Sequence, residues 1–412
     1  MFLLLLCVFF ITGGVANAQS STSSQYTQLG LGDLQSSAFA KNSSMGGLSQ
    51  AINNSNAINL SNPASYSSLE LTTFEAGIFS NFAKYSNSAN SFPTSIINNT
   101  SIAYLAFAFP ISKKWGSSFG LVPYSDVEYN MFKMETTQLG PVKDFYSGTG
   151  GINRFYIGNA FKPFKGLSVG FNASYLLGSI DKEKIVEFNP TFQAYNTQLT
   201  NILTVGDFYF NYGAIYTQEF KNDYSASLGF SGSTAKAIKA TMYDLTRQRG
   251  WNVNGNPVNG DTTSYNPNQK GKLALPAYVS GGLVIRKKNK WMFGVDYYTQ
   301  DWSKYTAFGE NGSLANSSKI ILGGEYFFKR ILYRAGLRYE KTDYKINDIQ
   351  VNERAFSVGI GFPISNGQSF LNISAEAAER GSLSNDLIRE QYLRITLGLT
   401  LSDRWFIKRK FD

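Results

Sequence analysis

The stretch Leu393-Arg394-Ile395-Thr396-Leu397-Gly398-Leu399-Thr400-Leu401 alternates between large aliphatic side chains and small or polar ones. Successive side chains of a β-strand point to opposite faces, so this segment has one apolar face and one polar face. About ten residues is also the length of a tilted strand that crosses a bilayer. The stretch therefore predicts a membrane-spanning strand with lipid on one side and a polar lumen on the other.

The same alternation recurs along the chain from about residue 66, for example from Tyr224, Phe293, Tyr333 and Phe356. Such segments begin near residues 69, 102, 115, 152, 167, 203, 224, 273, 290, 318, 331, 353, 370 and 389. An even number of strands is what a closed bacterial barrel needs. We therefore predict an all-β fold, a closed antiparallel transmembrane β-barrel of about fourteen strands over residues 66–412, located in the outer membrane.

The connections between these segments alternate in length. Short ones, such as Ser112–Lys114 and Lys329–Arg330, separate long polar ones at 82–98, 131–150, 181–200, 244–272, 303–317, 341–352 and 380–388. Short periplasmic turns alternating with long external loops are typical of outer-membrane barrels. The short turns are rich in lysine, which is compatible both with simple solvation and with a basic collar on the periplasmic side.

Composition excludes several classes of function. The chain has no histidine, and its one cysteine, Cys7, lies in the N-terminal segment. Histidine-dependent catalysis, His-based zinc sites and cysteine chemistry are therefore excluded, and we expect neither an enzyme nor a bound cofactor or metal. The net charge of +9 could suggest nucleic acid, but its placement in short turns favours lipid head groups or cell-wall polymers, and no nucleic-acid partner is expected.

Two N-terminal segments differ from the rest. Residues 1–18 contain an apolar run, Leu3–Ile11, followed by Ala16-Asn17-Ala18, which is typical of a secretory signal. Residues 19–65 are rich in Ser, Asn, Gln and Gly and lack strand alternation. They could be a disordered leader, or, given their apolar residues, a compact hatch that plugs the barrel.

Several short motifs resemble the family of outer-membrane transporters for long-chain fatty acids and aromatic hydrocarbons (FadL-like and TodX-like). They are Met45–Gly47 followed by Asn62–Ser65, which holds an Asn-Pro-Ala motif just before the first strand, together with Leu275-Pro276, Trp291 to Trp302-Ser303 and Arg334–Gly336. The C-terminal run Arg404–Lys410 resembles members from Bacteroidetes-type bacteria, although Asp412 departs from the usual terminal aromatic residue. The resemblance spans nearly the whole mature chain.

The resemblance implies a fourteen-stranded barrel with an N-terminal hatch and passive uptake of a hydrophobic small molecule. It assigns the hatch motif to Asn62, Pro63 and Ala64, although Pro63 could simply end the plug and Asn62 could bond its own backbone. It also implies a kinked third strand that opens sideways. Gly120 and Pro123 lie there, and a proline within a strand indicates a bulge or break, or only a strand end.

The polar face of the predicted strands carries both signs of charge. Mutual ion pairing in the lumen is the simplest interpretation of Asp296, Arg334, Arg338 and Arg394. The alternative is a ligand site in which an arginine receives a fatty-acid carboxylate, with Arg334 and Arg338 as the first candidates. Long loop 244–272, with Trp251 and Tyr265, could hold an apolar ligand or could be a variable surface loop.

A second class of function stays open at this point. Related barrels serve a protein secretion system as carriers of surface cargo, and a purely structural outer-membrane protein is a third possibility. The expected partners are outer-membrane lipids, a hydrophobic ligand and, for the rival, a secretion-system protein. A lumen lined by apolar side chains would favour transport, whereas a partner on the external face would favour the rival.

Overall fold

The computed structural model describes residues 24–87, 96–137, 140–188, 195–251, 257–364, 368–384 and 387–405. The signal predicted for residues 1–18 and the chain from Phe406 onward lie outside these ranges. Among the described residues, no helix is long and apolar enough to cross a membrane.

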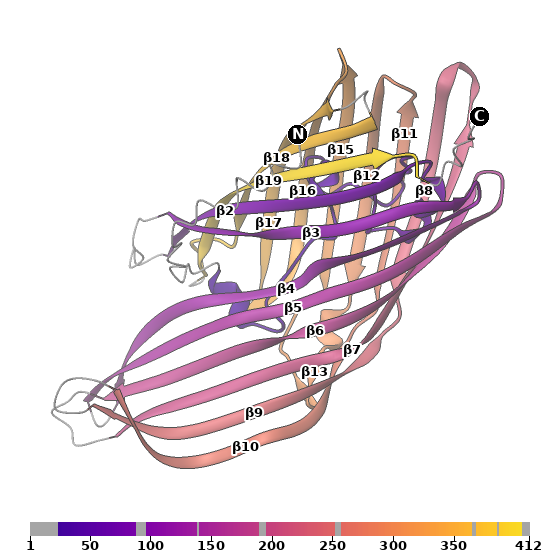
Figure 1. The fold of residues 1–412 in the computed structure, drawn as a ribbon. Helices are drawn as coiled ribbons and strands as arrows, with labels where there is room; N and C mark the ends of the chain where they lie inside the picture. The colour runs from indigo at the N-terminus through magenta and orange to yellow at the C-terminus, as the bar shows by residue number, and fades with distance from the viewer. Residues whose placement is uncertain are drawn as a thin grey trace, which may run out of the picture.

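The wall is one antiparallel sheet that closes on itself (Figure 1). Its strands are β2 (Thr72–Ser86), β3 (Ile97–Ser112), β4 (Trp115–Thr137), β5 (Gly140–Phe164), β6 (Leu167–Phe188), β7 (Asn196–Glu219), β8 (Tyr224–Ser233), β9 (Lys236–Trp251), β10 (Pro257–Leu275), β11 (Tyr278–Lys287), β12 (Trp291–Gln300), β15 (Ser317–Phe328), β16 (Ile331–Ile346), β17 (Ile349–Ile364), β18 (Ser369–Arg380) and β19 (Arg389–Asp403). The last strand pairs with the first from Asp403↔Thr72 to Arg389↔Ser86.

The prediction of a closed fourteen-stranded barrel is confirmed. β8 and β9 are two halves of one bent wall strand, because both pair with β7, and β10 and β11 are likewise separated only by residues 276–277. Counting each bent strand once gives fourteen, and every predicted segment falls on one of them. The remaining short elements are β1 (Asp33–Leu34), β13 (Thr306–Ala307), β14 (Glu310–Asn311), η3 (Lys221–Asp223) and four short helices whose bounds are given below.

Alternation sorts the side chains as the sequence predicts. On β19, Leu397 and Leu401 are exposed on the outer face, whereas Thr396 and Thr400 are buried inside. Neighbouring strands continue the outer apolar band with the exposed residues Ile78, Leu105, Phe119, Phe171, Phe210, Phe230, Leu283, Phe293, Leu322, Leu337, Phe356 and Leu371. A closed barrel with such a band is an integral outer-membrane protein, because lipid satisfies the apolar exterior and the pairing of β19 with β2 closes the sheet.

The long loops predicted at 131–150, 181–200, 244–272 and 341–352 are wrong. In each case the strands continue nearly to the tip, as in β5, which has 25 residues where about 9–11 suffice to cross a bilayer. Once a hairpin leaves the bilayer, its two faces meet different surroundings and the simple apolar-polar alternation fades. β4–β7, β9 and β10 thus form a curved extension on one side of the barrel, here called the lobe (Figure 1).

The lobe has an apolar interior. Its inner side chains include Ile152, Leu176 and Ile238, which pack with Trp302 and Tyr305 from the turn around η4 (Trp302–Lys304). Leu31, from the N-terminal segment, is buried in the same cluster. The N-terminal segment and the lobe are therefore packed into one continuous core.

Residues 24–71, here called the plug, lie inside the barrel. The plug contains η1 (Gln25–Gln28), β1, α2 (Ala40–Ser43) and η2 (Pro63–Ser68). Met45, Leu48, Ile52 and Leu60 are almost completely buried, at 2% exposure or less. The apolar residues that argued against a mere linker form the centre of this folded segment.

Glycines in the wall let the plug backbone approach closely. A Cβ on Gly336 would lie 2.1 Å from the carbonyl carbon of Met45 and 2.4 Å from the amide nitrogen of Gly46. Gly323, on the neighbouring strand, faces the Met45 carbonyl oxygen in the same way, at 2.4 Å. The plug backbone therefore rests directly on the wall backbone.

Replacing Gly336 with valine should displace the plug at this contact. We expect a loss of stability of about 1–3 kcal/mol, as for other overpacked interiors, because the neighbouring atoms are backbone and cannot rotate away. Gly281→Val is the matched control, since a Cβ there meets only the Gly229 carbonyl at 3.7 Å. Thermal unfolding in detergent and trypsin cleavage of the plug measure the effect, and equal behaviour of the two variants would contradict the packing.

Candidate functional site

The wall is interrupted between β3 and β4. The two strands pair only from Leu105↔Leu121 to Ser112↔Trp115, whereas β4 continues beside β5 as far as Thr137. Figure 1 shows the two ribbons separating beyond the paired part. From Val122 onward, the side of β4 that faces β3 is free of β3 pairing within the described strands.

Gly120 and Pro123 lie where this separation begins. The register between β4 and β5 shifts between Pro123 and Ser125, so a bulge follows the proline. Proline has no N–H to donate to a ladder, which suits the place where pairing with β3 ends. Gly120 belongs to the paired part, because a Cβ there would lie 2.4 Å from the Leu105 carbonyl oxygen. The sequence thus located a break in strand pairing, and its role in a lateral passage stays a prediction.

The plug covers the free side of β4. β1 pairs with β4 through Asp33↔Asp126 and Leu34↔Ser125, and the Gln35 amide donates to the Tyr124 carbonyl at 2.9 Å. One side-chain contact also crosses the interruption, from Asn99 Nδ2 on β3 to Glu128 Oε2 on β4 at 3.0 Å. Backbone groups that lost their partner in β3 are thereby satisfied by the plug.

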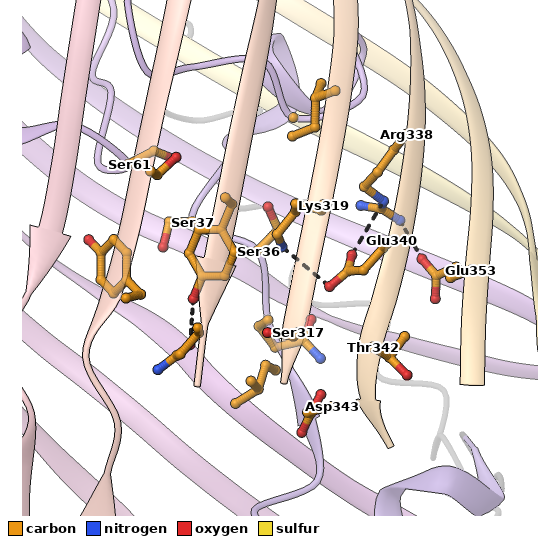
Figure 2. Close-up of a pocket in the computed structure, with 18 of the residues that line it drawn as sticks. Ser36, Ser37, Ser61, Ser317, Lys319, Arg338, Glu340, Thr342, Asp343 and Glu353 are labelled. Atoms are coloured by element: carbon orange, nitrogen blue, oxygen red, sulfur yellow. Dashed lines mark hydrogen bonds and ion pairs between the residues drawn. The ribbon is translucent and has the colours of Figure 1, made fainter. Parts of the chain in front are cut away.

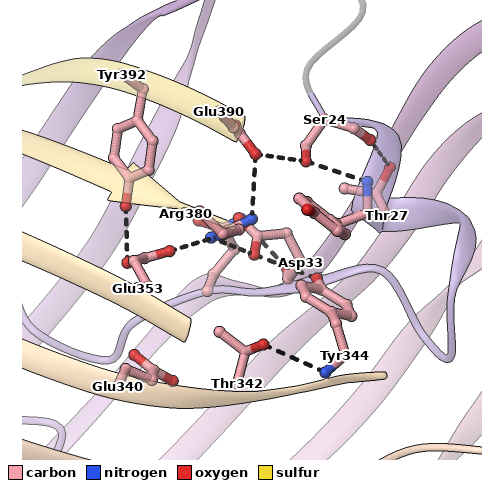
Figure 3. Close-up of polar contacts among 12 residues, drawn as sticks. Ser24, Thr27, Asp33, Glu340, Thr342, Tyr344, Glu353, Arg380, Glu390 and Tyr392 are labelled. Atoms are coloured by element: carbon pink, nitrogen blue, oxygen red, sulfur yellow. Dashed lines mark hydrogen bonds and ion pairs between the residues drawn. The ribbon is translucent and has the colours of Figure 1, made fainter. Parts of the chain in front are cut away.

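A buried network around Arg380 holds the same part of the plug (Figure 3). The guanidinium forms ion pairs with Asp33 of the plug at 3.0 Å and with Glu353 of β17 at 2.6 Å. Glu390 accepts a hydrogen bond from Ser24 Oγ at 2.8 Å. Removing one partner of such a buried pair costs about 3–5 kcal/mol, so these contacts hold the plug firmly against the wall.

The hatch motif fixes the other end of the plug. Asn62 Oδ1 accepts from the Ala64 amide at 3.1 Å, and its Nδ2 donates to the carbonyls of Gln50 and Phe230 at 2.7 and 3.1 Å. Pro63 packs against Gly170 of β6, where a Cβ would lie 2.6 Å from the Pro63 carbonyl. The motif thus caps η2 and ties the plug to the wall, while a gating movement of it stays a prediction.

Three of the four charged lumen residues are already engaged by protein groups. Arg334 pairs with Glu325 at 2.7 Å, and Arg338 pairs with Glu353 at 2.6 Å. Asp296 Oδ2 accepts from the plug amides of Ser49 and Gln50 at 2.6 and 2.9 Å. Mutual pairing and support of the plug therefore account for their contacts.

Arg394 differs from the other predicted arginines. Its guanidinium lies over the rings of Phe79 and Tyr392, at 5.1 and 5.6 Å, and forms no ion pair with any carboxylate in the described part of the chain. Arg394 also lines a cavity between plug and wall. It is therefore the predicted arginine best placed to meet an anionic group.

The cavity has a volume of about 200 Å³ and lies between the plug and the strands around the lumen. Its aromatic wall comes from Tyr124, Tyr209, Tyr278 and Tyr298. Figure 2 shows polar residues at its margin, where Lys319 and Glu340 pair at 3.5 Å. The site is thus amphipathic, with aromatic faces and charged groups on the same wall.

Sequence reasoning missed Arg154, which also lines this cavity. Arg154 is 7% exposed, and its Nη2 donates to Ser37 of the plug at 3.0 Å. Its Nε has no hydrogen-bond partner, and it forms no ion pair, among the described residues. It stands beside the β4 interruption, because Arg154 pairs across the sheet with Val122 and the next pair is Pro123↔Asn153. A lone arginine in an aromatic-rich strand gave no signal of its own.

The predicted ligand loop 244–272 takes a different form. Tyr265 is an exposed strand residue that packs edge-on against Tyr243 at 5.8 Å. Trp251 is the last residue of β9, and its side chain lies outside the described part. The pair of tyrosines is therefore part of the lobe's outer surface.

Comparison with solved structures identifies the same fold. A FadL homologue of Pseudomonas aeruginosa matches with a TM-score of 0.58 and 12% identity, covering 89% of this chain and 99% of that one. The toluene transporter TodX of P. putida matches with a TM-score of 0.58 and 14% identity, covering 90% of this chain and 100% of that one. The toluene transporter TbuX of Ralstonia pickettii matches with a TM-score of 0.58 and 12% identity, covering 89% of this chain and 98% of that one. At these identities the similarity establishes the fold alone.

Comparison with curated proteins finds no match. The family model of BamG, by contrast, matches residues 2–412, which is nearly the entire sequence. The chain therefore belongs to the BamG family, on a barrel of the FadL type.

Proposed function

We propose that the protein is a passive outer-membrane channel for small hydrophobic molecules, such as fatty acids or aromatic hydrocarbons. The observation that carries the proposal is the combination of a break in the wall at Pro123 with an amphipathic cavity directly behind it. The molecule enters from the lobe side of the barrel, rests in the cavity and leaves sideways between β3 and β4. Movement of the plug segment 24–35 away from β4 opens this route.

The chemistry of the cavity favours a ligand with an apolar body and an anionic end. Tyrosine rings offer flat apolar surface, and Arg154 and Arg394 each lack a carboxylate partner in the described chain. An arginine guanidinium binds a carboxylate through paired N–H donors, which is stronger than a neutral hydrogen bond. Fatty acids therefore suit the site better than unsubstituted hydrocarbons.

The rival function is an interaction barrel that serves a protein secretion system. Two features favour it: the plug is held by buried ion pairs, and the lobe extends far beyond what a bilayer requires. A barrel that only presents a surface has no need of a movable plug. The two functions therefore differ in whether the β3–β4 interruption must open.

Cross-linking β3 to β4 should abolish uptake. Because Cys7 is the only cysteine and lies in the predicted signal, Asn99→Cys/Glu128→Cys introduces the only pair available to a short cleavable bis-maleimide. We expect uptake of radiolabelled oleate by cells displaying the protein to fall at least tenfold on cross-linking and to return on cleavage. Ser80→Cys/Thr100→Cys is the control, since these residues pair within the intact β2–β3 wall. Unchanged uptake after cross-linking would rule out the β3–β4 route, whereas no uptake above that of cells lacking the protein would favour the interaction barrel.

Removing the Arg154 charge should weaken binding of an anionic ligand. For Arg154→Met we expect a loss of at least tenfold in oleate affinity, because a charge-assisted hydrogen bond contributes about 1.5–3 kcal/mol. Native mass spectrometry of the detergent-extracted protein measures the occupancy, and toluene serves as the neutral ligand that should be unaffected. Arg354→Met, at an exposed outer position, is the control. Equal oleate occupancy in all three proteins would refute the role of Arg154.

A further inference from the structure

The short turns at the end opposite the lobe carry an unusual concentration of positive charge. Three neighbouring turns contain six cations, here called the basic crescent: Lys221, Lys287, Lys288, Lys290, Lys329 and Arg330. Turns 112–114 and 162–166, farther along the same rim, add four more lysines. The charge thus follows one continuous part of the rim, from β3 to β16.

The three turns of the crescent form one connected surface. β8, β11, β12 and β15 are consecutive in the sheet, and the turns are joined by backbone hydrogen bonds. The Lys288 amide donates to the Asp223 carbonyl at 2.9 Å, and the Phe327 amide donates to the Lys290 carbonyl at 2.8 Å. The cations are therefore held at fixed spacings rather than on independent loops.

Few opposite charges neutralise the crescent. Among the described residues of these turns and the adjoining strand ends, the exposed acids are Glu219 and Asp223, and none of the six cations forms an ion pair within the described ranges. Five of the six lie on exposed residues. Like charges placed this close repel one another. Binding of an anionic partner relieves this repulsion and therefore lowers the free energy of the crescent.

Exposed aromatic residues lie directly beside the cations on the outer wall. Phe220, Trp291, Tyr326 and Phe328 are all at least 36% exposed there. The Lys287 ammonium lies 4.7 Å from the Tyr224 ring centre, and that of Lys329 lies 5.3 Å from the Phe328 ring centre. Aromatic girdles mark the level of the lipid head groups in barrels of this kind.

We propose that the basic crescent binds the head groups of anionic phospholipids in the leaflet that borders the short turns. The aromatic residues enter that leaflet from the wall, which places the cations at the depth of the phosphates. An acidic soluble partner would have no use for the outward-facing aromatic residues. Several lysines close to a membrane surface act together on anionic lipids, and the attraction is screened by salt.

The full-length protein in mixed bilayers tests the proposal. Trp115 and Trp291 lie at this rim, so bromine-labelled phosphatidylglycerol and phosphatidylcholine, used separately, report by fluorescence quenching which lipid lies beside it. We expect phosphatidylglycerol to be preferred several-fold in low salt and the preference to shrink in 1 M KCl. In the variant Lys288→Gln/Lys290→Gln/Lys329→Gln/Arg330→Gln, which removes four of the six cations of the crescent, the preference should fall at least twofold.

The control is a variant that loses the same number of cations at the other end of the barrel. Lys133→Gln/Lys239→Gln/Lys270→Gln/Lys272→Gln removes four exposed cations from the lobe side, and the preference should persist. Equal quenching by both lipids in the wild type would overturn the proposal. So would an equal loss in the control, which would assign the effect to net charge alone.

Discussion

Every backbone N–H and C=O in a bilayer needs a partner within the protein, and this requirement organises the whole molecule. The wall meets it by closing β19 onto β2 over the full length of both strands. β4 departs from this pattern, because it loses β3 after Leu121. There the plug supplies the missing partners through β1, so the segment that fills the lumen also completes the wall. A channel that opens at this place must exchange one set of hydrogen bonds for another.

The charged groups of the lumen fall into two sets, those that are paired within the protein and those that are not. Most of its charged groups, among them Arg334, Arg338, Arg380 and Asp296, are paired with each other or with the plug. Such pairs position the plug and contribute less net stability than their number suggests, because desolvation offsets much of the attraction. Arg154 and Arg394 stand apart, since both face the cavity without a carboxylate partner in the described chain. This contrast separates charged groups that already have a partner of opposite charge or a plug amide from arginines whose charge is available to a ligand.

The sequence predicted the barrel because the bilayer enforces alternation on each spanning strand, as on β19. It misjudged 131–150, 181–200, 244–272 and 341–352 because that constraint ends where the strands leave the lipid. The pairing of Arg334 with Glu325 follows from register, since the two residues lie opposite each other on β16 and β15. Arg154 could not be recognised, because its lack of a partner depends on which strands surround it in three dimensions.

Hydrogen–deuterium exchange on the intact barrel tests the central claim, that the plug seals the wall beside β4 and releases it for a ligand. Without ligand, the amides of residues 24–35 and 124–128 should be protected together. On saturation with oleate, exchange in these two segments should rise in parallel, while β18, β19 and β2 remain unchanged. If oleate binds and is taken up while both segments stay equally protected, the β3–β4 interruption is not the route and the account is contradicted.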